Sequence, residues 1–316
     1  MNEVRVAIVG AGYMATEHAK AFSRLPGVHL AGITSRTLAR AARLADNHTS
    51  LQVFDSIEEM HAHTQADLVV VCVRELDLLG VVGKTFSLPW VHLVEKPLGH
   101  DLQEARIIHR MSLERQSKVY AAFNRRFYSS TRIALNQLEA DDSRRLVSIL
   151  DQEDAVSARA SGQPEAVVEN WMFANAIHLI DLFHIFCRGN LESVRPIQPW
   201  RGLSTELVLG ELTFDSGDIG LYQAVWNRPG PWSVAVSTRD RRLEMKPVEK
   251  VTEQLAGSRV SRELDLDPVD GECKPGLVRM AEAAVAAVRG ENHCLPTIEA
   301  SLRSMELVAA LYGKTV

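Results

Sequence analysis

The feature that most constrains this chain is a short apolar segment near residue 4 that ends at a pair of glycines. Residues 4–9 (VRVAIV) are rich in β-branched side chains, which is typical of a buried strand. Gly10, Gly12 and Ala15 follow in the pattern G-x-G-x-x-A and lead into a helical segment over 15–25. The first glycine permits a tight turn, the second lets backbone approach a diphosphate, and the small third residue allows close helix–strand packing. The start of such a helix presents free N–H groups, so the segment predicts a dinucleotide-binding turn, although ordinary strand–turn–helix corners share the pattern.

Strands and helices alternate through the first 120 residues. Beyond the opening strand, the apolar runs predict strands over 28–34, 51–54, 67–73, 90–94 and 118–123, with helical patterns between them. This alternation predicts a parallel sheet with right-handed crossovers, in which ligands bind beyond the carboxyl ends of the strands. We therefore expect an α/β fold that begins with a Rossmann dinucleotide-binding domain over residues 1–122. Expected cofactor contacts near the first and fourth strand ends are Tyr13, Met14, Cys72 and Val73.

The end of the second predicted strand bears on the choice between NAD(H) and NADP(H). A site that prefers NAD usually has an acidic residue here, which accepts hydrogen bonds from the adenosine ribose. The sequence instead reads Thr34-Ser35-Arg36-Thr37, with Arg40 one helical turn further on. Arg36 and Arg40 can pair with a 2′-phosphate, and Ser35 can donate to it, although both arginines can equally be solvated residues at a helix start. This pattern favours NADP(H) over NAD(H).

The second half of the chain has a different pattern. Successive strands are predicted over 146–150, 207–214, 219–226 and 233–237, without intervening helices between the last three. This arrangement indicates an α+β domain over residues 123–316 with a mainly antiparallel open sheet. Residues 239–266 are highly charged and are expected to be loop or edge strand.

A helical segment over 170–186 carries candidate polar site residues. His178 and Asp181 are three residues apart and therefore share a helix face. The spacing His-x-x-Asp-x-x-His is also compatible with metal binding, but the sequence offers no cluster of further ligands, so we expect no metal.

A resemblance to a known family becomes specific at Glu95-Lys96-Pro97, which directly follows the predicted strand over 90–94. Together with the glycine turn, this motif resembles the Gfo/Idh/MocA family of nicotinamide-dependent sugar and cyclitol oxidoreductases. The segments 124–127 (NRRF) and 296–312 resemble the family's domain crossover and its closing loop and helix. The resemblance extends over essentially the whole chain, in order and spacing.

The resemblance implies roles for the residues of this motif. Lys96 would hydrogen-bond the reacting oxygen of the substrate and help to move its proton, Glu95 would lie at the nicotinamide ribose, and Pro97 would shape the turn after an often cis peptide bond. The physical chemistry of the residues agrees, since a lysine at the end of a buried strand can be partly desolvated, which lowers its pKa. Lys96 would thus contact cofactor and substrate.

The family's helix commonly carries an aspartate and, four residues later, a histidine that work with the lysine. His178 matches the histidine, but Ala174 stands where the family has aspartate. Either Lys96 and His178 suffice, or Asn175 or Asn170 supplies a neutral hydrogen bond to a substrate hydroxyl. Further expected substrate contacts are Arg125, Trp171 and Asp181.

Length, charge and cysteine content exclude several classes. The 316 residues carry a net charge of −5, which argues against a general nucleic-acid-binding protein. No apolar run approaches the length of a membrane span, and the chain opens on a strand without a secretion signal. The four cysteines are scattered, which fits free thiols in a reducing cytoplasm better than disulfides.

We therefore expect an NAD(P)-dependent dehydrogenase or reductase that acts on a secondary alcohol or ketone of a sugar, nucleotide sugar or cyclitol. The resemblance also implies a homo-oligomer, a dimer or tetramer assembled through the C-terminal sheet. Two alternatives are a sugar-modifying enzyme that recycles its bound cofactor without net redox change, and a non-catalytic regulatory protein that binds NAD(P).

Overall fold

The computed structural model describes residues 3–314, which form two compact units. The first unit contains the chain up to Asn124 together with Val269–Leu302, and the second contains Arg125–Pro268 and the residues from Arg303 on. From the sequence, all residues after 122 were expected in the second domain. In the structure, residues 269–302 instead return to the first unit.

The first unit is built on a six-stranded sheet in the order β3-β2-β1-β4-β5-β6, and every neighbouring pair is parallel. This strand order is that of the Rossmann fold, so the predicted N-terminal fold is confirmed. The strands are β1 (Val4–Val9), β2 (Val28–Thr34), β3 (Gln52–Phe54), β4 (Leu68–Val71), β5 (Val91–Glu95) and β6 (Lys118–Ala122). The apolar run of β4 is wholly buried, as expected for a central parallel strand.

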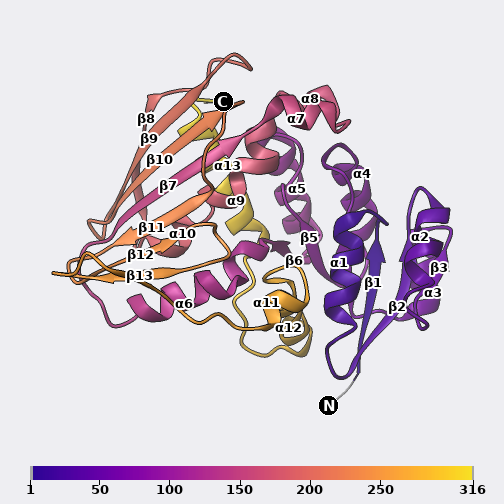
Figure 1. Ribbon diagram of the computed structural model, residues 1–316. Coiled ribbons are helices and arrows are strands. Elements are labelled where there is room, and N and C mark those ends of the chain that lie inside the picture. The colour runs from indigo at the N-terminus through magenta and orange to yellow at the C-terminus, as the bar shows by residue number, and fades with distance from the viewer. Residues whose placement is uncertain (1–2, 315–316) are drawn as a thin grey trace. The chain divides into compact units, whose positions relative to one another are not determined.

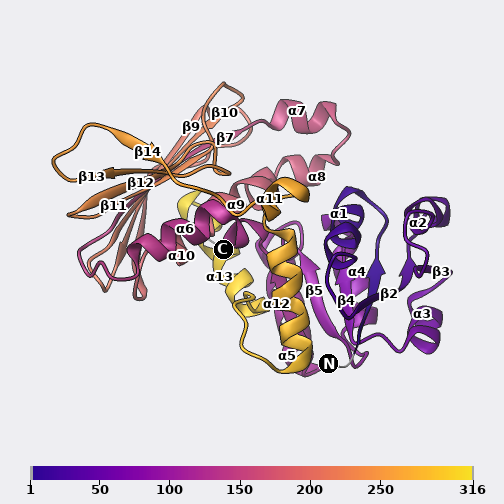
Figure 2. The ribbon, with the colours of Figure 1, turned by 60° about the horizontal axis from the view of Figure 1, so that its bottom comes forward.

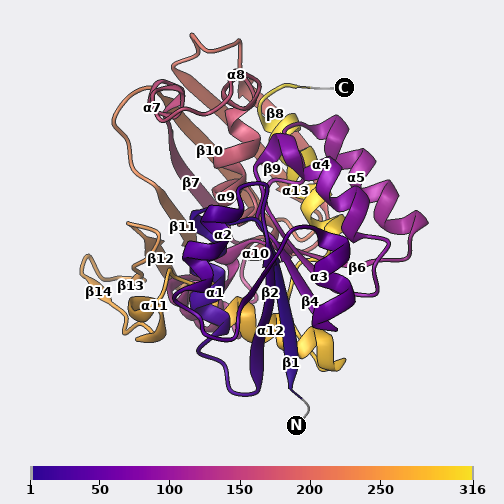
Figure 3. The same cartoon turned by 90° about the vertical axis from the view of Figure 1, so that its right-hand side faces the viewer.

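Five helices cross over between these strands: α1 (Tyr13–Phe22), α2 (Leu38–Ala45), α3 (Ile57–Thr64), α4 (Glu75–Thr85) and α5 (Leu102–Glu114). Figure 3 shows α1 and α2 on one side of the sheet, with α3, α4 and α5 on the other. Two of the helices begin at capping side chains: Ser56 accepts from the Glu59 amide, and Asp101 accepts from the Glu104 amide.

The C-terminal part of the first unit comprises α11 (Val269–Glu272), α12 (Leu277–Arg289) and the start of α13 (Ile298–Leu311). Helix α12 packs against α1, β4 and β5. It returns to this unit because one of its faces is apolar and rich in alanine, with Leu277, Ala281 and Ala284 buried at helical spacing. Residues distant in sequence thus complete the hydrophobic core on the α1 side of the sheet.

The second unit is built on an eight-stranded sheet in the order β14-β13-β12-β11-β7-β10-β9-β8 (Figure 1). All its pairs are antiparallel except β7 with β10, which is parallel, so the predicted mainly antiparallel sheet is confirmed. The strands are β7 (Leu146–Glu153), β8 (Leu191–Gln198), β9 (Leu207–Phe214), β10 (Ile219–Trp226), β11 (Ser233–Ser237), β12 (Arg241–Met245), β13 (Thr252–Leu255) and β14 (Ser261–Glu263).

Helices cover one face of this sheet. Figure 2 shows α6 (Ser129–Leu138), α9 (Ile177–Ile180) and α10 (Phe183–Phe186) on the same side. The remaining helical segments are the 3₁₀ helix η1 (Asn124–Phe127), α7 (Ala155–Ala160), α8 (Glu165–Val168) and the π-helix η2 (Met172–Ala176). Burial alternates along β7, with Val147 and Ile149 buried against the helices and Leu146 47% exposed on the opposite, open face.

The charged segment 239–266, expected to be loop or edge strand, forms three strands at one edge of the sheet. The reason is a buried carboxylate: Glu253 on β13 is paired with Arg241 of β12 at 2.8 Å and with Arg262 of β14 at 2.6 Å. A single acid thus joins three adjacent strands. Because these partners are brought together only by strand register, the charge pattern in the sequence did not reveal them.

Substitution of Gly10 tests how strictly the turn after β1 requires glycine. Gly10 has φ +111°, and a Cβ there would lie 2.1 Å from the Cys72 carbonyl oxygen, whereas a Cβ on Gly12 would have no heavy atom within 4 Å. Gly10→Ala should therefore lower the free energy of unfolding by about 2 kcal/mol or more, as expected of backbone strain combined with overpacking.

Urea denaturation would measure this loss, with Gly12→Ala as the matched control. Gly12→Ala should change stability by less than about 1 kcal/mol, because its backbone is extended and any L-residue can adopt it. Equal unfolding free energies for Gly10→Ala and wild type would contradict the prediction.

Candidate active site

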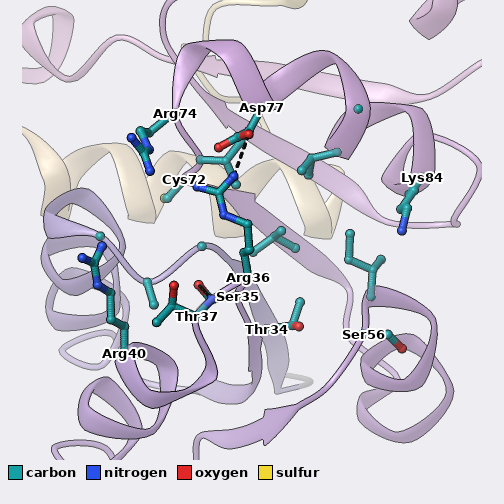
Figure 4. A pocket seen from close by; sticks show the side chains of 18 of the residues that line it. Thr34, Ser35, Arg36, Thr37, Arg40, Ser56, Cys72, Arg74, Asp77 and Lys84 are labelled. Carbon is teal, nitrogen blue, oxygen red and sulfur yellow. Dashed lines mark hydrogen bonds and ion pairs between the residues drawn. The ribbon is translucent and has the colours of Figure 1, made fainter. Parts of the chain in front are cut away.

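The first unit contains a cavity of about 600 Å³ at the carboxyl ends of its parallel strands. Its walls are the turns after β1, β2, β3 and β4 and one side of α4, and Figure 4 shows many of the lining side chains. The predicted cofactor residues that line it are Gly10, Gly12, Ser35, Arg36, Arg40, Cys72 and Val73. The volume is of the size typical of ligand pockets, and its position is that at which open α/β sheets bind ligands.

The glycine turn fits a diphosphate. The Gly10 amide donates to the Thr34 carbonyl at 2.8 Å, which ties the turn to the end of β2. Gly12 is the N-cap of α1 and makes no side-chain capping bond, and the first turn of α1 contains no acidic residue. The helix start therefore offers amide donors and the positive end of its dipole to an anion. Ala15 is fully buried, as close helix–strand packing requires, while the side chain of Tyr13 is 66% exposed.

Arg36 spans the cavity to an acidic partner that the sequence analysis did not identify. Its Nη1 lies 2.9 Å from Oδ1 of Asp77 on α4, as drawn in Figure 4. The side chains are 67% and 38% exposed, and such solvent-exposed pairs contribute only about 0–1 kcal/mol. A ligand phosphate can therefore compete with Asp77 for Arg36. Ser35 accepts from the Thr37 amide at 3.3 Å and lies beside Arg36 at the cavity wall.

The motif Glu95-Lys96-Pro97 lies at the end of β5. Glu95 is 9% exposed, and its Oε1 lies 2.7 Å from Nε2 of His18, a fully buried residue of α1. The Lys96–Pro97 peptide bond is cis, and Lys96 is half-buried. Burial and the charge of Glu95 raise the pKa of the Cys72 thiol well above its usual range. Cys72 therefore stays a neutral part of the cavity wall and does not act as a nucleophile.

The second unit groups several of the expected substrate contacts. The His178 ring lies edge-on to the Trp232 ring at 6.4 Å between centroids, and the Arg125 guanidinium lies over the same indole at 4.6 Å. Asn175 precedes His178 by three residues, and its Nδ2 donates to both carboxylate oxygens of Glu153 at 3.1 and 3.0 Å.

Glu153 determines which end of the Asn175 amide is presented. A carboxylate only accepts hydrogen bonds, so it holds the amide nitrogen, and the carbonyl oxygen of Asn175 points elsewhere. Glu153 is fully buried, while Asn175 is half-buried. The amide therefore offers an acceptor close in sequence to His178, one residue after the alanine that replaces the family's aspartate.

Asp181 and Asn170, both expected substrate contacts, have hydrogen-bond partners within the protein. Asp181 is 1% exposed and accepts two hydrogen bonds from Arg126, at 2.7 and 2.6 Å, and a third from Ser304 at 2.6 Å. The amide of Asn170 donates to the Ala166 carbonyl and accepts from Lys314 at 2.9 Å. The remaining candidate of this segment, Trp171, is half-buried. Asp181 was predicted as a site residue because it shares a helix face with His178, whereas its burial against Arg126 depends on the tertiary fold.

Two buried carboxylates on β7 were also absent from the predicted site residues. Asp151 and Glu153 are 1% and 0% exposed, and they share a face because they are two residues apart on a strand. Tyr222 donates to Asp151 at 2.8 Å and lies 3.0 Å from the hydroxyl of Tyr312. Burial raises the pKa of Asp151 to about 6, against the hydrogen bond from Tyr222. Asp151 and Glu153 lie just beyond the strand predicted over 146–150, and their alternate spacing was the signal that could have found them.

Residues 3–314 offer no metal site and no membrane-spanning helix. No group of three or more His, Cys, Asp or Glu side chains is placed to hold a metal ion. In the same part of the chain, no helix combines the length and apolar character that crossing a bilayer would need.

Comparison with known proteins agrees with this geometry. Residues 4–123 match the oxidoreductase family with the NAD-binding Rossmann fold. A 4-carboxy-2-hydroxymuconate-6-semialdehyde dehydrogenase from Sphingobium is 23% identical over 72% of this chain and 74% of its own length. An inositol 2-dehydrogenase from Corynebacterium glutamicum is 30% identical over 45% of this chain, which spans 43% of that enzyme.

Solved structures share the whole fold. A dehydrogenase from Chromobacterium violaceum has a TM-score of 0.82 at 17% identity, covering 98% of this chain and 94% of that one. A UDP-N-acetylglucosamine 3-dehydrogenase from Acidithiobacillus ferrooxidans has a TM-score of 0.78 at 16% identity, covering 98% and 96%. A 3-ketoreductase from Actinomadura kijaniata, solved with TDP-benzene and NADP, has a TM-score of 0.74 at 17% identity, covering 98% and 96%.

Fold, cavity and relatives together define an NAD(P)-dependent dehydrogenase. The glycine turn and the strand order that carry the match are those of the first unit. Residues 4–123 match the Gfo/Idh/MocA family of oxidoreductases, which agrees with the resemblance found in the sequence.

The raised pKa of Asp151 predicts a pH-dependent stability. The folded protein keeps the Asp151 proton up to about pH 6, whereas the ordinary value is 3.8, so the stabilising contribution of this group is complete below about pH 4 and is lost as the pH rises through 6. Asp151→Asn should remove this loss. The unfolding free energy of the variant relative to that of wild type, measured in urea, should therefore rise between pH 4 and pH 7.

Tyr222→Phe provides the opposite test. This variant lacks the hydrogen bond that favours the charged carboxylate, so its loss of stability should move to higher pH. Parallel pH profiles for wild type and both variants would show that Asp151 does not titrate in this range.

Proposed function

We propose that this dehydrogenase transfers hydride between a nicotinamide cofactor and the carbon of a secondary alcohol or ketone in a sugar, nucleotide sugar or cyclitol. The observation that carries the proposal is the glycine-lined cavity of the Rossmann unit, with Glu95-Lys96-Pro97 at the end of β5 of the same sheet. The substrate class is supported by relatives that are named for inositol and for UDP-N-acetylglucosamine.

NADP(H) is the proposed cofactor. The residues that end β2 include no acid to accept from the adenosine ribose, and Arg36 and Arg40 both line the cavity there. Arg36 would exchange its weak pairing with Asp77 for the 2′-phosphate, and Ser35 would donate to the same group. A relative of the same fold was solved with NADP.

The chemistry divides between the cofactor and the protein. The nicotinamide supplies or accepts the hydride. Lys96 would hydrogen-bond the reacting oxygen, taking its proton in the oxidation and returning it in the reduction, with His178 as its partner in proton transfer. The Asn175 carbonyl, oriented by Glu153, would accept from a neighbouring substrate hydroxyl in place of the aspartate absent at position 174. Arg125 and Trp232 would contribute further contacts.

The second unit also provides the surface for the proposed homo-oligomer. On the open face of the sheet, Leu221 is 48% exposed and Leu146 is 47% exposed, beside the half-buried Leu209 and Val225. Burying such an apolar strip is a common basis for isologous association. A reducing cytoplasm is the proposed location, because the four cysteines are free thiols.

Replacement of Lys96 tests the catalytic assignment. Lys96→Met keeps the apolar stem but removes the ammonium, so turnover should fall by about 10²–10⁴-fold, the usual contribution of general acid–base catalysis. Steady-state kinetics on the best substrate from a panel of sugars, nucleotide sugars and cyclitols would measure this. Calorimetric binding of NADPH should change by less than about threefold, because the proposed contacts with phosphate and adenosine are intact.

The same panel separates the alternatives. Full activity of Lys96→Met would contradict the role of Lys96. Product formed without a change in nicotinamide absorbance would indicate a cofactor-recycling enzyme. Cofactor binding without turnover of any substrate would favour a regulatory protein, which the alanine at position 174 makes worth testing.

Replacement of Arg36 tests the cofactor preference. Arg36→Ala should weaken NADPH binding by roughly tenfold or more, since a charge-assisted hydrogen bond contributes about 1.5–3 kcal/mol, and should leave NADH binding nearly unchanged. Arg43→Ala is the matched control, because Arg43 is an exposed arginine of α2, the helix that follows Arg36, and does not line the cavity. Equal losses for NADH and NADPH, measured by calorimetry, would contradict recognition of the 2′-phosphate by Arg36.

A further inference from the structure

The returning C-terminal segment places a lysine against Tyr13, the residue that follows the glycine turn. Lys274 follows α11, and its Nζ lies over the Tyr13 ring, 5.2 Å from the centroid. Tyr13 is the first residue of α1 and directly follows Gly12, the N-cap. Lys274 was not among the predicted cofactor contacts, because it lies more than 250 residues from the turn in sequence.

The segment is held in place by its neighbouring acids. Glu272 pairs with Arg24, just beyond the C-terminal end of α1. Oδ1 of Asp270 accepts from the Gly276 amide at 2.8 Å, which closes the turn before α12. Both acidic side chains of this stretch thus have partners other than Lys274, and they anchor the backbone on either side of it.

The electrostatics of this corner favour an anion. Among residues 3–314, no carboxylate oxygen lies within 4.0 Å of the Lys274 ammonium, which instead lies over the ring of Tyr13. The start of α1 is uncapped by a side chain and has no acid in its first turn, so a second positive pole lies at the same end of the helix. An anion bound at this end of α1 would be attracted both by the helix N-terminus and by the half-buried Lys274 ammonium.

The aromatic contact alone does not account for this placement. Tyr13 is 66% exposed, and a cation–π pair at an exposed site contributes about 0.5–1 kcal/mol. Instead, the ring provides a surface that keeps the lysine stem near the turn while its ammonium retains donors for another group. Lysine binds phosphate as a compact charge with three donors.

We infer that Lys274 is a cofactor-binding residue that contacts the diphosphate of the nicotinamide dinucleotide. The C-terminal segment would thereby close one side of the site that the glycine turn opens. This inference rests on the proposed use of a nicotinamide cofactor. It differs from the role of Arg36, because the diphosphate is common to NAD(H) and NADP(H) whereas the 2′-phosphate is not.

Calorimetric titration of the purified full-length protein with NADH and NADPH tests the inference. Lys274→Met retains the stem and removes the charge, so the Kd for both dinucleotides should rise by the same factor, roughly tenfold or more, as for loss of a charge-assisted hydrogen bond. Lys274→Arg should remain within about threefold of wild type, because it keeps the charge. The matched control is Lys20→Met, an exposed lysine in the last turn of the same helix, which should change neither Kd.

Ligands that carry only part of the dinucleotide test which phosphate Lys274 contacts. ADP, which carries a diphosphate, should lose affinity for Lys274→Met, whereas adenosine 2′-monophosphate should not. The dependence of NADH binding on salt should also become shallower in Lys274→Met, because one charge is lost from the contact. Thermal unfolding of each variant verifies that it remains folded.

The outcomes separate this inference from the proposed function. Wild-type protein that binds neither dinucleotide would overturn both. Wild-type binding that is unchanged in Lys274→Met would overturn the role of Lys274 and leave the cofactor assignment intact. An equal loss of adenosine 2′-monophosphate affinity would also overturn it, because the contact would then not be with the diphosphate.

Discussion

The close approach of the Gly10 backbone to the Cys72 carbonyl is the contact on which the cofactor cavity depends. A side chain at position 10 would overlap that carbonyl, so the turn after β1 can pass the end of β4 only as glycine. This passage brings Gly12 and the start of α1 to the edge where β1, β2 and β4 end. The anion-binding character of the site therefore follows from a steric requirement of the sheet.

The second unit is organised by charges buried in its core. Asp151 and Glu153 lie on the covered face of β7, where Tyr222 donates to one oxygen of Asp151 and Asn175 donates to Glu153, and Asp181 accepts from Arg126 and Ser304. Burying carboxylates opposes folding unless partners are supplied, so these acids require a defined arrangement of the elements around them. One consequence bears on function, since Glu153 sets the orientation of the Asn175 amide. The alanine at position 174 is thus accompanied by a neighbouring amide whose orientation is defined.

Much of the first unit could be predicted because its signals are local. Apolar runs with short helical segments between them indicate buried parallel strands, and caps such as Ser56 and Asp101 lie within three residues of their partners. The second unit was less predictable. Residues 239–266 form strands through long-range pairing with Glu253, and β8 is exposed along most of its length, so neither segment has the alternation that identifies a strand.

The candidate site also divides into features that local sequence predicts and features that depend on long-range packing. The sequence by itself determined the glycine turn, the absence of an acid after β2 and the position of Lys96 at a strand end, because these depend on order along the chain. Only the tertiary structure decided that Arg36 meets Asp77, that Asp181 is enclosed by Arg126, and that Lys274 lies over Tyr13. The physical reason is that burial and charge pairing depend on which elements pack together, and residues far apart in sequence carry no local sign of the partner they will meet.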